Sequence, residues 1–220
     1  WSQHVHPDTT AVEDSDSSYT VDTPCGARAT FRLSVVMLGR SAVQGGCYEP
    51  GATAVGDVRP ITVPRYFLGG HRYALTAKEI TGPGLSPATW RYHYQSDIGF
   101  APMANGTSRT RVLSPDGVLD TYTFGNTYSV DEGLLLTHTR TSNQQTVLSE
   151  AHTYATGTTT PGFPKLVGAH PDAYDRTPAA FLRPKLSTTA IQDGTVFRST
   201  VNSVDGFGRP TSVTRSSAPQ

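Results

Sequence analysis

Residues 89–94 read Thr-Trp-Arg-Tyr-His-Tyr, and this short stretch decides the fold. Its three aromatic residues alternate with Arg91 and His93. A repeat of two residues places all the aromatic side chains on one face of a β-strand, whereas a helix would spread them around its axis. We therefore predict a strand here, with one buried aromatic face.

The same pattern extends in both directions from this stretch and is interrupted by turn signals. Residues 114–117, Ser-Pro-Asp-Gly, separate two strand-like runs, and so do residues 142–145, Ser-Asn-Gln-Gln; both are typical of β-hairpins. Further strands are expected at residues 28–38, 71–81, 108–113, 118–124, 134–141, 146–154, 185–191, 195–204 and 210–214, with turns at 82–84, 192–194 and 205–208. No segment has the 3.6-residue apolar period of a helix. The sequence predicts an all-β fold, a continuous strip of antiparallel β-hairpins with long Pro/Gly/Thr-rich loops and little or no helix.

The composition agrees with this prediction and argues against several classes of protein. Among 220 residues there are 21 glycines and 16 prolines, and only 16% are charged, which argues against a helical bundle. The formal net charge is zero. A nucleic-acid-binding face brings an excess of positive charge, so we expect no nucleic-acid partner. No apolar run approaches the roughly 20 residues of a membrane-spanning helix, and residues 1–4 show no sign of a signal peptide.

Three stretches depart from the hairpin rhythm. Residues 1–24 look irregular, and the acidic residues 13–18 among them are expected to form a solvated loop. Residues 59–64 contain two prolines, each of which removes a ladder donor, so we expect an edge or an extended connector. Residues 157–184 contain five prolines and are expected to form a long loop or a wrapped extended segment.

The turn near the C-terminus resembles a known repeat. Residues 204–210, Val-Asp-Gly-Phe-Gly-Arg-Pro, are similar to the tyrosine–aspartate (YD) repeat of RHS proteins, in which an aromatic–Asp pair is followed two residues later by Gly-Arg. Asp205, Gly208 and Arg209 match that pattern, and Val204 stands where the repeat has Tyr. The physical basis is a turn that needs Gly at a positive φ angle, with Asp bonding the turn backbone.

Longer stretches resemble further signatures of bacterial RHS chains. Residues 78–94 and 115–135 do so in order, and residues 22–43 resemble an upstream part less specifically, so the resemblance covers about two-thirds of the chain. It divides the chain into an N-terminal extended or β segment, an RHS-like hairpin strip, the Pro/Thr/Gly-rich loop and YD-repeat-like hairpins, at residues 1–65, 66–156, 157–184 and 185–220.

The resemblance implies an architecture rather than a reaction. Chains of this family wind a long strip of β-hairpins into a hollow shell, which in bacterial toxins encloses a C-terminal toxic domain. Such shells take many more residues, so 220 residues would be a section of a shell or a smaller relative. The family's self-cleaving core segment and toxic tail find no match here, so no catalytic residue is carried over.

Several groups of residues were weighed as metal or acid–base sites. His4 and His6, with Asp8, could share a metal on one face of a strand, but a frayed terminus explains them better. Glycosidase chemistry needs carboxylates that converge across a cleft. The neighbouring pair Asp131 and Glu132 is better explained by a turn. Solvated positions explain the other acidic grouping, which consists of Asp14 and Asp16.

The remaining candidates also have structural explanations. Histidines in predicted strands could serve a Ser-His-Asp set, but half-buried or lumen-facing positions are the better interpretation; these are His71, His93, His138 and His152. An aromatic stripe could stack sugars, but cross-strand packing is favoured; its members are Trp90, Tyr92, Tyr94, Tyr122 and Phe124. Residues 105–107, Asn-Gly-Thr, are a glycosylation sequon or a turn, and we favour the turn. Cys25 and Cys47 could form a disulfide or remain two buried thiols.

Together these observations predict a structural protein with no catalytic, cofactor or metal site. The leading hypothesis is a scaffold or shell segment of an exported bacterial RHS-type protein, secreted or at the cell surface. Its partners would be other segments of such a chain, copies of itself or an enclosed toxin domain. The alternative is a self-assembling filament or adhesion protein that pairs through open β edges. A carbohydrate-binding surface module, or a hydrolytic one, is a lesser alternative.

Overall fold

The computed structural model describes residues 11–39, 69–96, 106–127, 131–155, 166–169 and 179–220. Within these residues the secondary structure is all β, without a helix. The strands are β1 (Ala11–Asp22), β2 (Arg28–Gly39), β3 (Gly69–Gly82), β4 (Leu85–Ser96), β5 (Thr107–Leu113), β6 (Leu119–Gly125), β7 (Leu135–Ser142), β8 (Gln145–Tyr154), β9 (Leu166–Ala169), β10 (Ala179–Leu182), β11 (Lys185–Gln192), β12 (Thr195–Val204) and β13 (Pro210–Pro219). The predicted fold class is confirmed.

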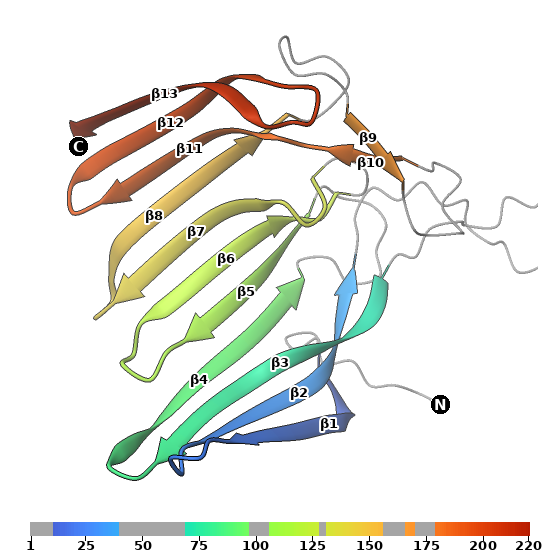
Figure 1. Ribbon diagram of the computed structural model, residues 1–220, viewed down its shortest axis with the longest axis vertical. Helices are drawn as coiled ribbons and strands as arrows, with labels where there is room; N and C mark the ends of the chain where they lie inside the picture. Colours follow the sequence, from blue (N-terminus) through green and yellow to red (C-terminus); the bar gives the residue numbers. More distant parts are fainter. Residues whose placement is uncertain (1–10, 40–68, 97–105, 128–130, 156–165, 170–178) are drawn as a thin grey trace, which may run out of the picture.

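Eleven of these strands form one antiparallel sheet, in which each strand pairs with its neighbours along the chain (Figure 1). The order runs from β1 to β8 and continues with β11, β12 and β13. The short strands β9 and β10 pair only with each other, within the stretch predicted as a long loop. The sheet is therefore a meander of hairpins, with β1 at one edge and β13 at the other.

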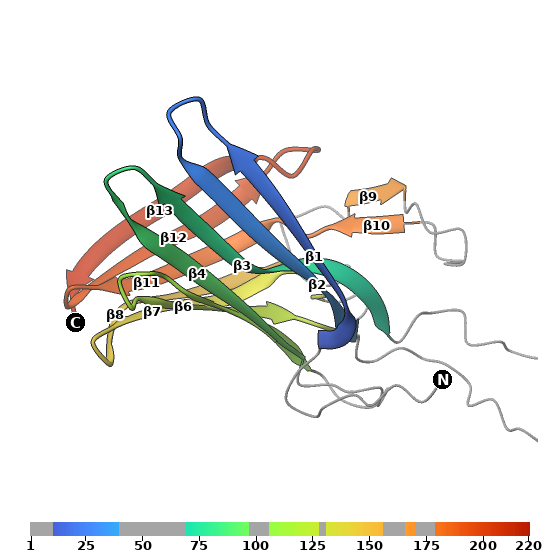
Figure 2. The ribbon, with the colours of Figure 1, turned by 90° about the horizontal axis from the view of Figure 1, so that it is seen from below.

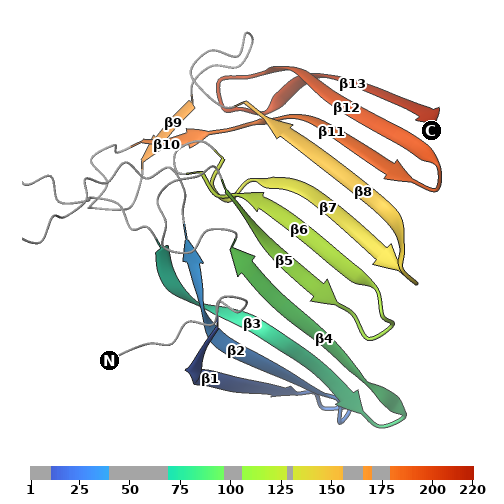
Figure 3. The ribbon, with the colours of Figure 1, turned by 180° about the vertical axis from the view of Figure 1, so that it is seen from behind.

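Most of the tight turns gather at one end of the sheet. Figure 3 shows the turns β1–β2, β3–β4, β5–β6, β7–β8 and β11–β12 at this end, while the β12–β13 turn lies at the other. Asn143 and Gln144 have φ angles of 49° and 64°, and Asp193 and Gly194 of 49° and 69°. Two successive positive φ angles define the two-residue turn that matches strand twist. Both turns lie inside the predicted hairpin signals.

A second turn type occurs three times, and each time its fourth residue is glycine. The three turns span Thr23–Ala27, Ser114–Val118 and Asp205–Arg209. In each, the first residue's N–H donates to the carbonyl of the fifth, and the glycine N–H donates to the carbonyl of the first. The φ of the fourth residue, Gly26, Gly117 or Gly208, lies between 78° and 80°, a region closed to most side chains. The positive φ predicted for Gly208 is confirmed.

The register assigns the two faces of the sheet a different character. Residues opposite each other in antiparallel strands point to the same face. One row runs Tyr94, Thr110, Tyr122, His138, Glu150 and the next runs His93, Arg111, Thr121, Thr139, Ser149. We call the face with the first row the aromatic face and the face with the second the polar face. Trp90 and Tyr92 share the aromatic face and are half-buried, whereas Arg91 and His93 are exposed, so the predicted alternation is confirmed.

The sheet is a single curved layer with very little fully buried apolar surface. Figure 2 shows β1–β3 and β12–β13 rising on the same side of the middle strands. Among the described residues, Val36 is the one large apolar side chain that is fully buried, at 2% exposure. Four buried polar residues accompany it: Ser34, Asn126, Thr127 and His138. The aromatic side chains of this layer are therefore half-buried and not enclosed in a core.

One local prediction was wrong. The acidic residues 13–18 lie within β1 and not in a solvated loop. Residues 11–12 and 17–22 pair with β2, whereas residues 13–16 have no partner in it and are carried as a bulge between the two paired stretches. The register of β1 on β2 shows this irregularity: it shifts between Val12 and Ser17 and is regular from Ser17 to Asp22.

Candidate functional site: the charged cluster, the polar face and the open edges

A buried histidine joins three strands of the aromatic face. The His138 Nε2 lies 2.7 Å from Oδ1 of Asp120 on β6, and its Nδ1 lies 3.0 Å from Oε2 of Glu150 on β8. The ring of Tyr122 stacks on the imidazole, with 4.4 Å between centroids and 4° between planes. Arg140 closes the cluster with bonds of 2.9 and 3.2 Å to the two oxygens of Asp120.

The electrostatics of this cluster favour the carboxylate form of Asp120. Burial alone raises the pKa of Asp120, but the hydrogen bonds from Arg140 and His138 outweigh it, and the pKa lies below its ordinary value. Both ring nitrogens are engaged by carboxylates, so His138 cross-links β6, β7 and β8.

The YD-like turn between β12 and β13 is held by its aspartate. The Asp205 Oδ1 accepts hydrogen bonds from the N–H groups of Phe207 and Arg209, at 2.8 and 3.0 Å. Its Oδ2 accepts from Nε of Arg209 at 2.7 Å, and the guanidinium of Arg209 lies 5.2 Å from the Phe207 ring centroid. The backbone bond from Arg209, followed by its side-chain bond, lowers the pKa of Asp205. The predicted bonding of the turn backbone by Asp205 is confirmed.

Side chains of the aromatic stripe contact neighbouring strands of the sheet. The Nζ of Lys78 lies 3.8 Å from the centroid of the Trp90 ring and covers one of its faces. The hydroxyl of Tyr94 on β4 donates to the carbonyl of Leu75 on β3, and that of Tyr154 on β8 donates to the carbonyl of Leu135 on β7, so each joins two adjacent strands. Burial raises the pKa of both tyrosines. These contacts make the stripe a set of cross-strand ties.

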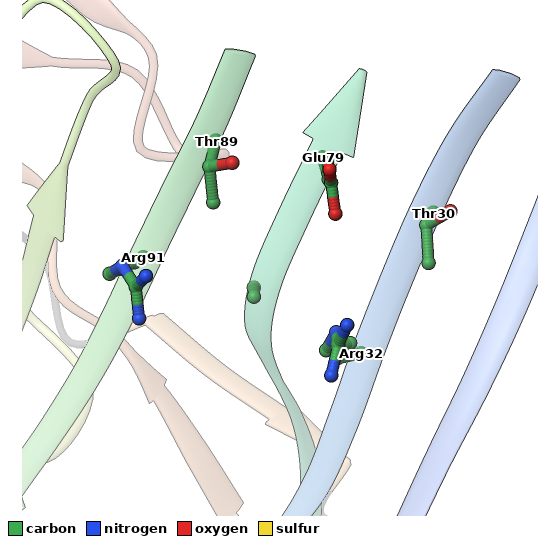
Figure 4. A pocket seen from close by; sticks show the side chains of 6 residues that line it. Thr30, Arg32, Glu79, Thr89 and Arg91 are labelled. Carbon is green, nitrogen blue, oxygen red and sulfur yellow. The ribbon is translucent and has the colours of Figure 1, made fainter. Parts of the chain in front are cut away.

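The polar face contains a hollow of about 400 Å³ over β2, β3 and β4. Arg32 and Arg91 stand on either side of Ala77 in one row of the register. Glu79 lies in the next row, flanked by two threonines, as Figure 4 shows. The small side chain of Ala77 leaves the space between the two guanidinium groups open.

The edge strands are the third feature. Every residue of β13 is exposed, and Tyr19 and Val21 of β1 are 61% and 55% exposed. An edge strand presents backbone N–H and C=O groups that the sheet does not use, and such a row pairs readily with another strand. Within the described residues nothing pairs with the outer side of either edge.

The sequence candidates are distributed widely and do not form one site. His93 is exposed on the polar face, and Nδ1 of His152 lies 3.1 Å from Oγ1 of Thr188. The Asp131 Oδ1 accepts the N–H of Thr127 at 2.8 Å and holds the β6–β7 connection, in agreement with the predicted turn. Cys25 is exposed in the β1–β2 turn. His71 lies in β3 and Asp14 and Asp16 lie in β1, while His4, His6, Asp8, Cys47 and Asn105 lie outside the described residues.

Sequence reasoning missed the partners of His138 and the role of the arginines. Asp120, Arg140 and Glu150 come from three different strands, and only the register brings them together. In the described ranges no cluster of His, Cys, Asp or Glu has the arrangement of a metal site. The same ranges contain no helix that could cross a membrane.

Within the described residues, the chain forms an open, single-layered strip of antiparallel hairpins with one aromatic and one polar face. Comparisons with models of protein families, with curated proteins and with solved structures found no match to this chain.

Proposed function

We propose that the chain is a structural scaffold, a segment of a β-hairpin shell of the RHS/YD type that encloses or presents a partner. The observation that carries this proposal is the open single layer, with both edges unpaired and one fully buried apolar side chain among the described residues. A layer of this kind gains stability when further strands extend it. The YD-like turn at Asp205 also supports the proposal, because its residues make the contacts that the repeat pattern requires.

Hydrogen exchange on the edge strands tests this role. In the natural gene product, the β13 amides that point away from β12 should exchange slowly, because a following strand covers them. In the 220-residue chain alone they should exchange fast, while the amides of β6 and β7 are protected in both. Fast exchange of the outer β13 amides in the natural product would show that the edge is free and would refute the scaffold proposal.

Self-assembly through the same edges is the second candidate function. It is favoured by the complete exposure of β13, which offers a long strand to a second copy. Light scattering should then give a mass that rises with concentration. Val213→Lys should suppress the rise because lysine on an edge opposes pairing. Val147→Lys is the matched control, since Val147 is equally exposed, at 38% against 40%, but lies in the interior strand β8. A constant monomer mass at all concentrations would exclude self-assembly.

A carbohydrate-binding surface is less well supported. Sugar stacking needs an open aromatic ring, and Lys78 occupies one face of Trp90. The ring of Tyr122 is likewise stacked on His138.

A further inference from the structure

The polar face carries arginines for which the described part of the chain provides no ion-pair partner. Arg32 on β2, Arg91 on β4 and Arg111 on β5 are exposed, and within the described residues none of them forms an ion pair. On the aromatic face, by contrast, Arg140 is paired with Asp120. A chain with zero net charge thus keeps a group of available cations on one face.

The register fixes the spacing of these arginines. Arg32 and Arg91 lie opposite Ala77 from its two sides, so two strand spacings, about 9.5 Å, separate their backbones. Arg111 is opposite His93 and therefore diagonal to Arg91, about 7–8 Å away. Carboxylates at every second position of an extended peptide are about 7 Å apart. The diagonal spacing therefore matches that repeat, and the hollow over Ala77 gives the peptide room.

The chemistry of the hollow selects among anions. A guanidinium presents a planar fork of donors that binds a carboxylate through two parallel hydrogen bonds. Glu79, between Thr30 and Thr89, adds acceptors for the peptide N–H groups of a ligand. The same carboxylate repels every anion, but it repels a chain of closely spaced phosphates more strongly than a peptide in which carboxylates alternate with uncharged residues. An acidic polypeptide of this kind therefore fits better than a nucleic acid or a polyphosphate.

We propose that the hollow and the neighbouring part of β5 bind an extended acidic segment of a partner polypeptide, with Arg91 and Arg111 facing carboxylates two residues apart and Arg32 contributing positive charge at the other side of the hollow. The proposal deepens the proposed function and rests on it, since the enclosed or presented partner would supply the segment. The binding itself is measured independently of the edge strands, so its failure would leave the scaffold role untouched.

The test is fluorescence anisotropy with the folded chain and a labelled peptide of alternating Glu and Thr, beside a peptide of alternating Gln and Thr. We expect saturable binding of the first peptide alone, weakened by salt. Arg91→Gln should weaken binding about fivefold or more, and the double variant R32Q/R91Q should weaken it further. Arg215→Gln is the matched control: it removes one exposed charge from β13, on the aromatic face, and should leave binding unchanged.

The substitution Glu79→Gln should change the peptide affinity in the opposite direction. Removing the only carboxylate among the six residues that line the hollow should tighten the Glu-Thr peptide by about twofold or more. Failure of the wild-type chain to bind this peptide would overturn the proposal, and so would equal losses in Arg91→Gln and Arg215→Gln. Tighter binding of polyphosphate or duplex DNA than of the peptide, lost in Arg91→Gln, would assign the hollow to another class of anion and would also overturn it.

Discussion

Replacing Asp120 by Asn should destabilise the sheet at its centre. The Asp120 side chain is 13% exposed and is hydrogen-bonded to His138 and Arg140. Its bond with His138, itself 10% exposed, is worth about 2 kcal/mol, as is typical of a charged bond away from water. The pair with Arg140 adds about 1 kcal/mol at most, because that side chain is 47% exposed. The side-chain oxygen of Asn can still accept a hydrogen bond and retains part of this stabilisation, so we expect the free energy of unfolding to fall by about 2 kcal/mol.

The assay is urea unfolding followed by circular dichroism, repeated over a range of pH. The pKa of Asp120 is lower in the folded chain than its ordinary 3.8. Its contribution is therefore complete above pH 3.8 and is lost as the pH falls through the folded value. The difference between the wild type and Asp120→Asn should be largest near neutral pH and should shrink in acid.

Asp22→Asn is the matched control for this experiment. Asp22 forms an ion pair with Arg28 of similar length, 2.7 Å, but the two side chains are 59% and 57% exposed. Water screens such a pair, so its loss should change stability much less. Equal effects of the two substitutions, or a difference between wild type and Asp120→Asn that is independent of pH, would refute the reasoning about the cluster.

Two further predictions concern the connections. Gly125→Ala should lower the free energy of unfolding by about 3 kcal/mol, because its new Cβ would collide with Asp131. Gly117→Ala should lower it by only about 1 kcal/mol, because its Cβ meets no atom and the cost comes from the positive φ alone. Urea unfolding of both variants measures these losses, and a larger loss for Gly117→Ala would contradict the prediction. Asp205→Ala should speed amide exchange in the β12–β13 turn and leave β6–β8 unchanged, because the carboxylate holds two turn amides; unaltered exchange at Arg209 would show that the backbone alone holds the turn.

The sequence was sufficient for the class of fold and for most strands and turns. The alternation around Trp90 and the Gly- and Asn-containing turns are local signals, and each acts within a few residues. The strand β1 could not be predicted in this way, because the pairing of residues 11–12 and 17–22 with β2 carries the extended backbone through the polar residues 13–16.

The charged cluster could not be predicted because a bulge decides it. Counting outward from the turn pair Ser142 and Gln145 would place Ser149 opposite His138. A register shift between Arg140 and Thr141 instead places Glu150 there. A shift of one residue exchanges the two faces of a strand, so the partner of His138 depends on a single irregularity that no local pattern announces.

The meander order has a mechanical consequence. Apart from the step from β8 to β11, every strand is bonded only to strands adjacent in the chain. Tension applied at the C-terminal end is therefore borne by one strand pair at a time, first β13 on β12 and then β12 on β11. Such a ribbon can be unzipped from this end one hairpin at a time, without any large region having to open at once.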